Sequence, residues 1–400
     1  MMVPKLRFKE FNKNWVDKKL DNVFSFKNGL NASKEMYGKG VKFINVLDII
    51  NNEKITFDVI HESVSATDEQ ISSYQVRQGD ILFQRSSETR DEVGQANVYA
   101  DSKTVLFGGF VIRARPVVNI NSAFLNFQLK TDALRKDITQ RSGGSTRYNI
   151  GQDSLGKVTA FFPEIKEQEK IANFLSTVDE KIALLNKQCG QLSLYKKSIM
   201  QKIFSQELRL KDENGGDFSH WNKKTLGSIF EQRSERACGN EKLLSVSIND
   251  GVKVFNDLKR KDNSSKDKSN YFKVFRNDIA YNSMRMWQGA SGISLYDGIV
   301  SPAYTVLKGN EKNSSLFFSY MFKLENIIFE FQKHSQGLTS DTWNLKYSKF
   351  KNIIVTVPCL KEQLKIAKML STIDDKIVAK KMELDKLKTW KQGLLQQMFV

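Results

Sequence analysis

Two polar segments in the first half of this chain carry side chains that could hydrogen-bond to nucleic acid. The first, FQRSSETRDEVGQANVY (83–99), follows a short apolar run. Arginine can bind guanine bidentately, and glutamine can do the same with adenine. The candidate DNA-binding residues in this segment are Arg85, Ser86, Ser87, Arg90 and Gln95. A solvated loop would explain any one of them equally well, so that alternative stays open.

The second segment, SGGSTRYN (142–149), combines two glycines with hydroxyl, basic and aromatic side chains. Glycines allow the backbone to approach a phosphate closely, and the residues that follow could then contact it. The candidates here are Ser145, Thr146, Arg147 and Tyr148. A turn that ends a helix would also explain the glycines, and both interpretations can hold together.

The second half of the chain has polar segments at matching places, YNSMRMWQGASG (281–292) and SQGLTSDTWN (335–344). Their candidates for DNA binding are Asn282, Arg285, Trp287, Gln288, Thr339, Ser340 and Thr342. Trp287 could instead belong to the core, the commoner place for tryptophan. The chain has no P-loop and no G-x-G-x-x-G, and its three histidines have no ligand-like neighbours. The sequence therefore predicts a binding protein without catalytic residues or a metal site.

The charge balance favours a polyanionic partner. The 400 residues carry a formal net charge of +17, with a pI near 9.5. Nucleic acid, an anionic membrane surface or an acidic protein would suit this charge, and a merely lysine-rich protein is the plain alternative. The three cysteines are scattered, which fits a reducing compartment. No apolar stretch approaches the ~20 residues of a membrane span, so we expect a soluble, cytoplasmic protein.

The elements that must position these segments occur twice. From Pro163 and from Pro358, 13 of 20 aligned residues are identical, and Trp15-x4-Leu20 is echoed by Trp221-x4-Leu226. Strand-like apolar runs and one amphipathic helix, ending near Ser142 or Ser335, recur in both halves. We expect an α+β tandem duplication. The predicted parts are a first globular domain (1–160), a long helix (161–207), a second globular domain (208–357) and a second long helix (358–400).

Both predicted long helices carry apolar residues at the a and d positions of a heptad repeat. In the first they are Ile171, Leu175, Val178, Ile182, Leu185, Cys189, Leu192, Ile199 and Ile203. We expect each stripe to pack on its twin, although packing on its own globular domain is the alternative. About 38 residues at ~1.5 Å each make a rod of about 57 Å. A compact chain then requires antiparallel coiled-coil rods related by a pseudo-two-fold axis, with Phe399 near Leu6.

An internal two-fold repeat with a basic surface suits duplex DNA. Dimeric DNA readers contact two half-sites that lie about 34 Å apart. Because the two halves of this chain differ in sequence, we expect two different half-sites. The predicted target is bipartite and asymmetric, with a gap set by the rods.

The order of motifs resembles the specificity subunit of type I restriction–modification systems over essentially the whole chain. The motifs are Trp-x4-Leu, P-x2-KEQ-x2-IA-x2-LST-x-D-x-KI in two copies, MRMWQGASG with GIVSPAYTVL, and the ending GLLQQMF. The resemblance implies a non-enzymatic subunit with two target-recognition domains and no cofactor of its own. It implies two methyltransferase subunits, which hold S-adenosylmethionine and methylate adenine. It also implies restriction subunits that use ATP and Mg²⁺ to translocate DNA and cut it.

Acidic and amide side chains begin both repeated helices, at Glu167, Gln168, Glu362 and Gln363. First-turn carboxylates favour a helix N-terminus, which is their plain interpretation. The resemblance adds that these repeated regions meet the methyltransferases, so we expect the four residues to bind the partner. A free-standing two-domain repressor or architectural DNA-binding protein is the alternative function.

Overall fold

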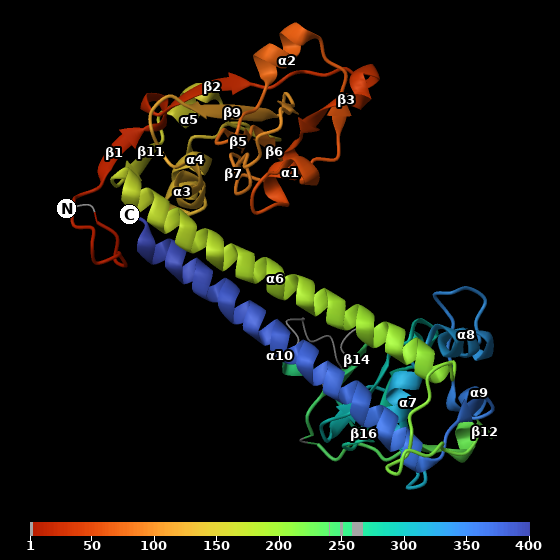
Figure 1. The fold of residues 1–400 in the computed structure, drawn as a ribbon. Helices are drawn as coiled ribbons and strands as arrows, with labels where there is room; N and C mark the ends of the chain where they lie inside the picture. Colours follow the sequence, from red (N-terminus) through yellow and green to blue (C-terminus); the bar gives the residue numbers. More distant parts are fainter. Residues whose placement is uncertain (1–2, 240, 249–250, 258–266) are drawn as a thin grey trace. The chain divides into compact units, whose positions relative to one another are not determined.

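The computed structural model describes every residue except 1–2, 240, 249–250 and 258–266 (Figure 1). The chain divides into two compact units. The first holds residues 1–187 and 381–400, and the second holds residues 188–380. Each unit has its own sheets and its own main hydrophobic core.

The first unit is built around a four-stranded antiparallel sheet with the strand order β2-β9-β5-β7. Strand β5 (Ile81–Gln84) is buried at every position, as its continuous apolar run predicts. Phe83 lies opposite Ile112 of β9 and opposite Ala96 of β7. The other strands of this sheet are β2 (Phe24–Asn28), β7 (Ala96–Val98) and β9 (Val111–Pro116).

Smaller sheets and short helices complete the first unit. Strand β3 pairs with β4 and β8, β1 pairs with β11, and β6 pairs with β10. These strands are β1 (Val16–Lys19), β3 (Tyr37–Ile44), β4 (Ser63–Val64), β6 (Ser86–Ser87), β8 (Leu106–Phe107), β10 (Tyr148–Asn149) and β11 (Thr159–Phe162). The helices are α1 (Val46–Ile50), α2 (Asp68–Tyr74), α3 (Ser122–Gln128), α4 (Asp132–Gln140) and α5 (Gln152–Gly156), with 3₁₀ turns η1 (Leu20–Asn22), η2 (Lys34–Met36) and η3 (Phe57–Val59).

The second unit repeats this plan. Its four-stranded antiparallel sheet has the order β13-β20-β17-β18, and β12 pairs with β21 as β1 pairs with β11. The strands are β12 (Asn222–Thr225), β13 (Phe230–Arg233), β14 (Leu244–Ser247), β15 (Gly251–Val254), β16 (Phe272–Val274), β17 (Ile279–Asn282), β18 (Ser291–Ile293), β19 (Gly298–Val300), β20 (Tyr304–Gly309) and β21 (Ile354–Val357). The helices are α7 (Ser315–Met321), α8 (Glu325–His334) and α9 (Tyr347–Phe350), with 3₁₀ turns η4 (Leu226–Ser228), η5 (Phe255–Asp257) and η6 (Met286–Gln288).

The single amphipathic helix expected in each half is broken into two, α3 and α4 or α7 and α8. The break in the first unit falls at Thr131, whose backbone is extended (φ −72°, ψ 150°). Its hydroxyl donates to the carbonyl of Gln128 at 2.7 Å, which ends α3. Leu324 takes the equivalent extended conformation in the second unit. The threonine hydrogen bond accompanies the break in the first unit only, since leucine has no side-chain donor, so the feature that both breaks share is one extended residue between two short helices.

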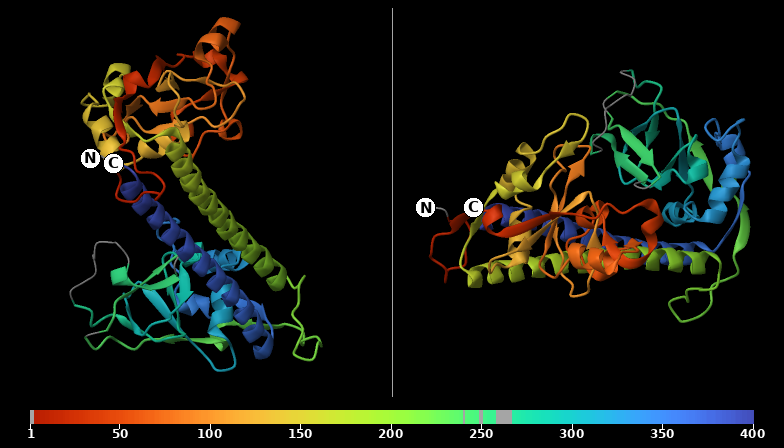
Figure 2. Two further views of the ribbon diagram at one scale, coloured as in Figure 1. Left: turned by 60° about the vertical axis from the view of Figure 1, so that its left-hand side comes forward. Right: turned by 90° about the horizontal axis from the view of Figure 1, so that it is seen from above.

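The two long helices are α6 (Ile165–Phe204) and α10 (Leu360–Met398), and each contributes to both units. Within the first unit the two helices run antiparallel (Figures 1 and 2). Phe174 of α6 packs on Trp390 of α10, and Lys181, which comes later in α6, lies 3.9 Å from Glu383, which comes earlier in α10. Within the second unit, Lys196 of α6 contacts Asp374 of α10 at 2.6 Å. The predicted antiparallel pairing is confirmed.

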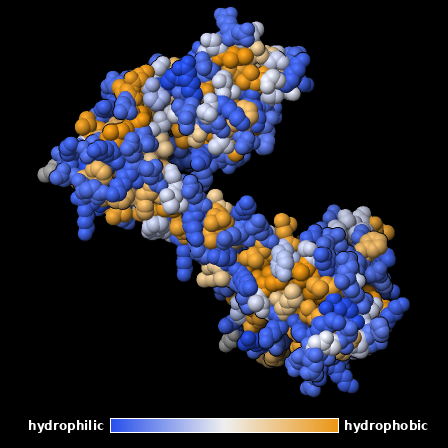
Figure 3. Space-filling model, in the orientation of Figure 1, coloured by the Kyte–Doolittle hydropathy of each residue, from blue (hydrophilic) through white to orange (hydrophobic). Residues whose placement is uncertain are grey.

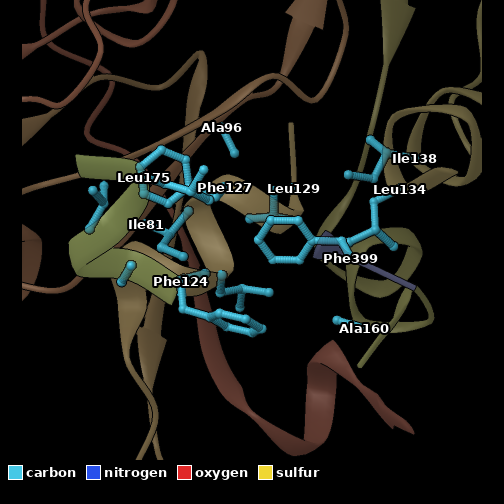
Figure 4. Packing of buried hydrophobic residues seen from close by; sticks show 14 of the residues in the cluster. Ile81, Ala96, Phe124, Phe127, Leu129, Leu134, Ile138, Ala160, Leu175 and Phe399 are labelled. Carbon is cyan, nitrogen blue, oxygen red and sulfur yellow. The ribbon is translucent and has the colours of Figure 1, made fainter. Parts of the chain in front are cut away.

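The heptad stripes contact both the twin helix and the globular part of their own unit. Leu175 belongs to the same buried cluster as Phe124 and Ile81 (Figure 4), together with Leu394 of α10. The two packing alternatives drawn from the sequence are therefore both true. One apolar stripe is wide enough to serve two neighbours, since a packed helix face spans about 100° or more.

The C-terminus returns to the start of the chain, as expected. The amide of Leu6 donates to the carbonyl of Gln397 at 2.8 Å. The Phe399 ring lies 6.3 Å from Trp15 and 5.3 Å from Phe124, as Figure 4 shows for Phe124 and Phe399 in one core. In the second unit, Phe204 lies in the same way, 6.2 Å from Trp221 and 5.2 Å from Phe317. Outside these cores, most of the surface in Figure 3 is hydrophilic.

Candidate nucleic-acid interface

In the first unit, β6 and β10 bring the two predicted polar segments together. Ser86 lies opposite Asn149, and Ser87 opposite Tyr148, although about 60 residues separate the strands. The Ser86 hydroxyl hydrogen-bonds to the Asn149 side chain. The amide of Ile150 donates to the carbonyl of Arg85 at 3.0 Å, which continues the ladder. One continuous polar surface therefore forms from segments that the sequence keeps apart.

Residues 143–149 form a hairpin whose shape depends on Gly144. At the base of the hairpin, the Gly143 amide donates a hydrogen bond to the Asn149 carbonyl at 3.0 Å, and the Asn149 amide donates to the Gly143 carbonyl at 2.8 Å. Gly144 has φ +122°, and a Cβ there would lie 2.0 Å from the carbonyl oxygen of Arg147. Only glycine fits such a position. At the tip, Ser145, Thr146 and Arg147 are exposed.

Several of the other candidate DNA-binding residues of the first unit form hydrogen bonds with groups of the protein itself. Arg85 donates to the Gly109 carbonyl at 3.3 Å, and Ser87 donates to Glu92 at 3.0 Å. Exposed Arg90 donates to the Thr139 carbonyl at 3.2 Å, in the last turn of α4. These hydrogen bonds position both arginine side chains. Because a guanidinium has five N–H donors, each arginine keeps further donors for a ligand. Gln95 and Tyr148 are half-buried.

The second unit joins its two segments by the same device. The amide of Leu345 donates to the carbonyl of Ser283 at 2.8 Å, the equivalent of the bond between Ile150 and Arg85. Backbone bonds of 3.0 and 2.8 Å join Gln336 and Asn344. Gly337 (φ +150°) is the equivalent of Gly144. A Cβ at this position would lie 2.7 Å from the Thr342 carbonyl, so the hairpin requires glycine here as well.

Turn η6 and the hairpin hold the second unit's candidates. Thr339 and Ser340 are exposed at the hairpin tip, whereas Thr342 closes the tip by accepting from the Thr339 amide at 3.1 Å and donating to its carbonyl at 2.9 Å. Asn282 accepts from the Met284 amide at 3.0 Å. Arg285 is half-buried and Gln288 exposed, at the two ends of η6.

Trp287 is half-buried, so it is neither a core residue nor a free surface residue. Its indole donates to the Met284 carbonyl at 3.1 Å, and its ring lies 5.1 Å from Trp343, edge to face. Trp343 was missed by the sequence analysis. The signal was present, since the Trp343-Asn344 pair matches Tyr148-Asn149 of the first unit.

Lys323 fixes the backbone behind η6. Its ammonium group donates to the Gly289 carbonyl at 2.7 Å and to the Ile248 carbonyl at 3.1 Å. Burial lowers the pKa of Lys323 to about 8, and nearby Lys196 lowers it further. Lys323 therefore ties the end of α7 to the loop that presents the candidate contacts.

The four residues predicted to bind a partner lie inside the fold, which corrects that prediction. Glu167, Gln168, Glu362 and Gln363 are each at most 4% exposed. Arg7 donates twice to Glu167, at 2.7 Å each, and this carboxylate raises the pKa of Arg7. Arg209 donates to Glu362 at 2.8 Å.

The glutamines bind both the helix start and the globular part of each unit. Gln168 donates to the Pro163 carbonyl at 2.8 Å and accepts from the Asn121 amide at 3.0 Å. Gln363 donates to the Pro358 carbonyl at 2.9 Å and accepts from the Ser314 amide at 2.9 Å. The identical KEQ motifs therefore build an identical internal joint in each unit.

The described residues add two negative findings. No helix among them combines the length and apolar character that a membrane span requires. Nor do they bring together three histidine, cysteine, aspartate or glutamate side chains that could hold a metal ion.

The fold defines a duplicated α+β protein with one polar hairpin surface per unit and paired long helices, the class of a two-domain DNA-recognition subunit. Two segments of the chain, residues 12–193 and 219–389, match the type I restriction modification DNA specificity domain. The chain belongs to this family and is a type I restriction–modification specificity subunit.

The curated relatives and the solved structures that resemble this chain match it over nearly its whole length. The chain is 24% identical to a putative type I restriction enzyme MjaX specificity subunit and 23% identical to the MjaIX specificity subunit, both from Methanocaldococcus jannaschii, over 96% of this chain and 93% of each relative. The fold resembles the S subunit of a type I restriction-modification system from M. genitalium, with a TM-score of 0.62, 20% identity and coverage of 100% and 99% of the two chains. A structure concerned with complex assembly and conformational transition of the type I R-M system gives a TM-score of 0.54 at 14% identity, over 96% and 97%.

Proposed function

We propose that each unit of this specificity subunit reads one half of a bipartite, asymmetric DNA site. The observation that carries the proposal is that both units build the same surface, a glycine-pinned hairpin hydrogen-bonded to a segment after a central strand. A two-stranded ribbon fits the major groove of B-DNA, where base edges are distinguishable. The exposed tip residues differ between the two ribbons except for Thr146 and Thr339, which both lie two residues after the glycine, so the two half-sites should differ.

The net charge of +17 supports phosphate binding, which supplies affinity, whereas the hairpin residues supply choice of sequence. The chain itself has no catalytic role in this proposal. Methyltransferase subunits bring S-adenosylmethionine, and restriction subunits bring ATP and Mg²⁺. A free-standing repressor would need no such partners, and the family match gives that alternative no support.

We also propose a docking surface for two identical methyltransferase subunits. Most identities in the repeated helices are buried or half-buried, so internal packing accounts for them. Besides Gln201 and Gln396 near the ends of the helices, four identical pairs are exposed: Lys166 and Lys361, Lys170 and Lys365, Thr177 and Thr372, and Lys181 and Lys376. Each long helix carries one residue of every pair, at positions i, i+4, i+11 and i+15. This spacing places the four residues on one face of the helix, within an arc of about 60° around its axis. Two identical partners require two such equal surfaces.

Mapping methylated adenines in a genome that expresses this chain with its methyltransferase tests the reading role. Wild type should give one bipartite sequence, and Arg285→Ala should relax the second half-site only. An unchanged methylation pattern in Arg285→Ala would contradict the assignment of that residue. The chain alone should neither methylate DNA with S-adenosylmethionine nor cut it with Mg²⁺.

Charge reversal tests the docking surface. Lys166→Glu and Lys361→Glu should each remove one methyltransferase from the complex, as measured by native mass. Lys187→Glu is the matched control, because this exposed lysine corresponds to Met382 and lies outside the repeated set. Full occupancy in both test variants would exclude this surface.

A further inference from the structure

The hairpin of the second unit presents a leucine to solvent. Leu338 follows Gly337 at the tip, and its side chain is fully exposed. A single exposed leucine on a protein surface needs no explanation in general. This one is unusual because the hairpin around it is rigid: Gly337 leaves no room for a Cβ, Thr342 closes the tip, and Gln336 pairs with Asn344.

Other large apolar side chains lie in the same two segments. The half-buried rings of Trp287 and Trp343 pack edge to face at 5.1 Å, and Met284 is 41% exposed. The two candidate DNA-binding segments of the second unit, residues 281–292 and 335–344, are called its reading segments below. Their surface combines polar candidate residues with apolar side chains. At the tip of the first unit's hairpin, by contrast, the residue after Gly144 is Ser145, and Thr146 and Arg147 follow.

Phosphate binding does not account for an apolar tip. Phosphate oxygens accept hydrogen bonds and attract charge, which Leu338 cannot supply. In the major groove, the C5-methyl group of thymine is the apolar feature of the base-pair edges, and apolar side chains read it. A narrow, rigid ribbon is also the kind of element that the major groove admits.

We propose that Leu338 is a specificity-determining residue that contacts the C5-methyl group of a thymine in the second half-site. The inference rests on the proposed function and names one base feature that the second unit reads. The first unit, with a polar tip, reads its half-site through hydrogen bonds.

The test is a double-mutant cycle between protein and DNA, carried out with the complex of this chain and its methyltransferase. Each thymine of the second half-site is replaced in turn by deoxyuridine, which removes only the methyl group. Wild type should lose affinity about fourfold at one thymine, equivalent to about 0.8 kcal/mol for one buried methyl group. Leu338→Ala should bind thymine DNA about three- to tenfold more weakly and should show no further loss with deoxyuridine at that position.

Leu295→Ala is the matched control, because Leu295 is 58% exposed in the same unit but lies outside both reading segments. It should keep the wild-type affinity and the wild-type response to deoxyuridine. Since Leu338 is fully exposed, its replacement should leave the unfolding temperature unchanged. The salt dependence of binding should also stay unchanged, because no phosphate contact is removed.

A flat deoxyuridine scan with wild type would overturn the inference. If Leu338→Ala then abolished a DNA bend, Leu338 would be an intercalating wedge, as apolar side chains are in some DNA-bending proteins. The proposed function would survive this result if Arg285→Ala still relaxed the second half-site. Loss of specific DNA binding altogether in the wild-type complex would instead refute the proposed function.

Discussion

Lys391 of α10 forms an ion pair with Asp179 of α6 in the first unit, and Lys196 of α6 forms the equivalent pair with Asp374 of α10 in the second. Both lysines occupy heptad a positions, where an apolar residue is usual. The side chains of the first pair are 13% and 15% exposed. A polar residue at an a position fixes the register of paired helices at some cost in stability. The duplicated pair therefore specifies the antiparallel register of α6 and α10 in each unit.

Breaking the first pair should destabilise the first unit. Burial raises the pKa of Asp179 although Lys391 opposes the shift, so the carboxylate is costly to bury without its partner. Lys391→Leu should lower the free energy of unfolding by about 3 kcal/mol. Lys391→Leu with Asp179→Leu should recover most of this loss, as measured by chemical denaturation. Additive losses would show that the pair does not act as a unit.

The exposed pair Lys181 and Glu383 is the control for this cycle. Its side chains are 53% and 45% exposed at a distance of 3.9 Å. Lys181→Leu should change the free energy of unfolding by less than about 1 kcal/mol, because exposed ion pairs contribute little.

Arg209→Ala should destabilise the second unit through the charge that it leaves behind. The Glu362 side chain is 1% exposed, so its carboxylate would be buried without a charged partner. We expect a loss of about 3 kcal/mol or more in the free energy of unfolding. Lys211→Ala removes an exposed pair with Asp217 nearby and should have little effect. Equal effects of the two variants would exclude a structural role for the buried joint.

Gly144→Ala should impair reading of the first half-site. A Cβ would lie 2.0 Å from the Arg147 carbonyl, so the hairpin tip must rearrange. We expect at least a tenfold loss in affinity for the specific site, with a cost of about 1–3 kcal/mol in local strain. Electrophoretic mobility shifts with the assembled complex would measure the loss. Gly143→Ala is the neighbouring control, since nothing lies within 4 Å of its added Cβ.

Lys323 should make the stability of the second unit depend on pH. Its pKa is about 8 in the fold and about 10.4 in an unfolded chain, so the unfolded state binds more protons between these values. The penalty for burying the charged amine is fully present below pH 8 and is relieved as pH rises toward 10.4. The buried tyrosines Tyr281 and Tyr320, whose pKa values are raised, oppose this trend above pH 10.

The measurement is the unfolding free energy of wild type and Lys323→Met between pH 7.5 and 9.5. Wild type should gain stability relative to the variant across this window. A difference that stays constant with pH would show that the pKa of Lys323 is not lowered in the native state, because the native and unfolded chains would then bind the same number of protons across this window.

The expectation that the paired long helices set the gap between half-sites predicts that the gap changes when the helices are lengthened. One added heptad in α6 after Lys187 and one in α10 after Lys380 would lengthen the pair by about 10.5 Å while keeping the heptad phase. We expect the gap between half-sites to grow by about three base pairs. Methylation mapping would measure the new gap, and an unchanged gap would exclude the helices as its determinant.

The duplication, the α+β class, the antiparallel helix pair and the family could be predicted from sequence, because they depend on local periodicity and on repeated motifs. The heptad positions Leu175 and Ile182 identify their buried face by spacing alone. The return of Phe399 to the first unit followed from chain connectivity.

The fine structure of the reading surfaces required the fold. The pairing of Ser86 with Asn149 joins segments distant in sequence, and no local pattern specifies such a contact. The same reason explains the corrected role of Glu167: a first-turn carboxylate looks exposed in sequence, but the arginine that pairs with it lies 160 residues away. Sequence by itself thus determined the elements and their duplication, because these depend on neighbouring residues. Tertiary structure alone decided which polar groups are buried and which are presented, because burial depends on what packs against them.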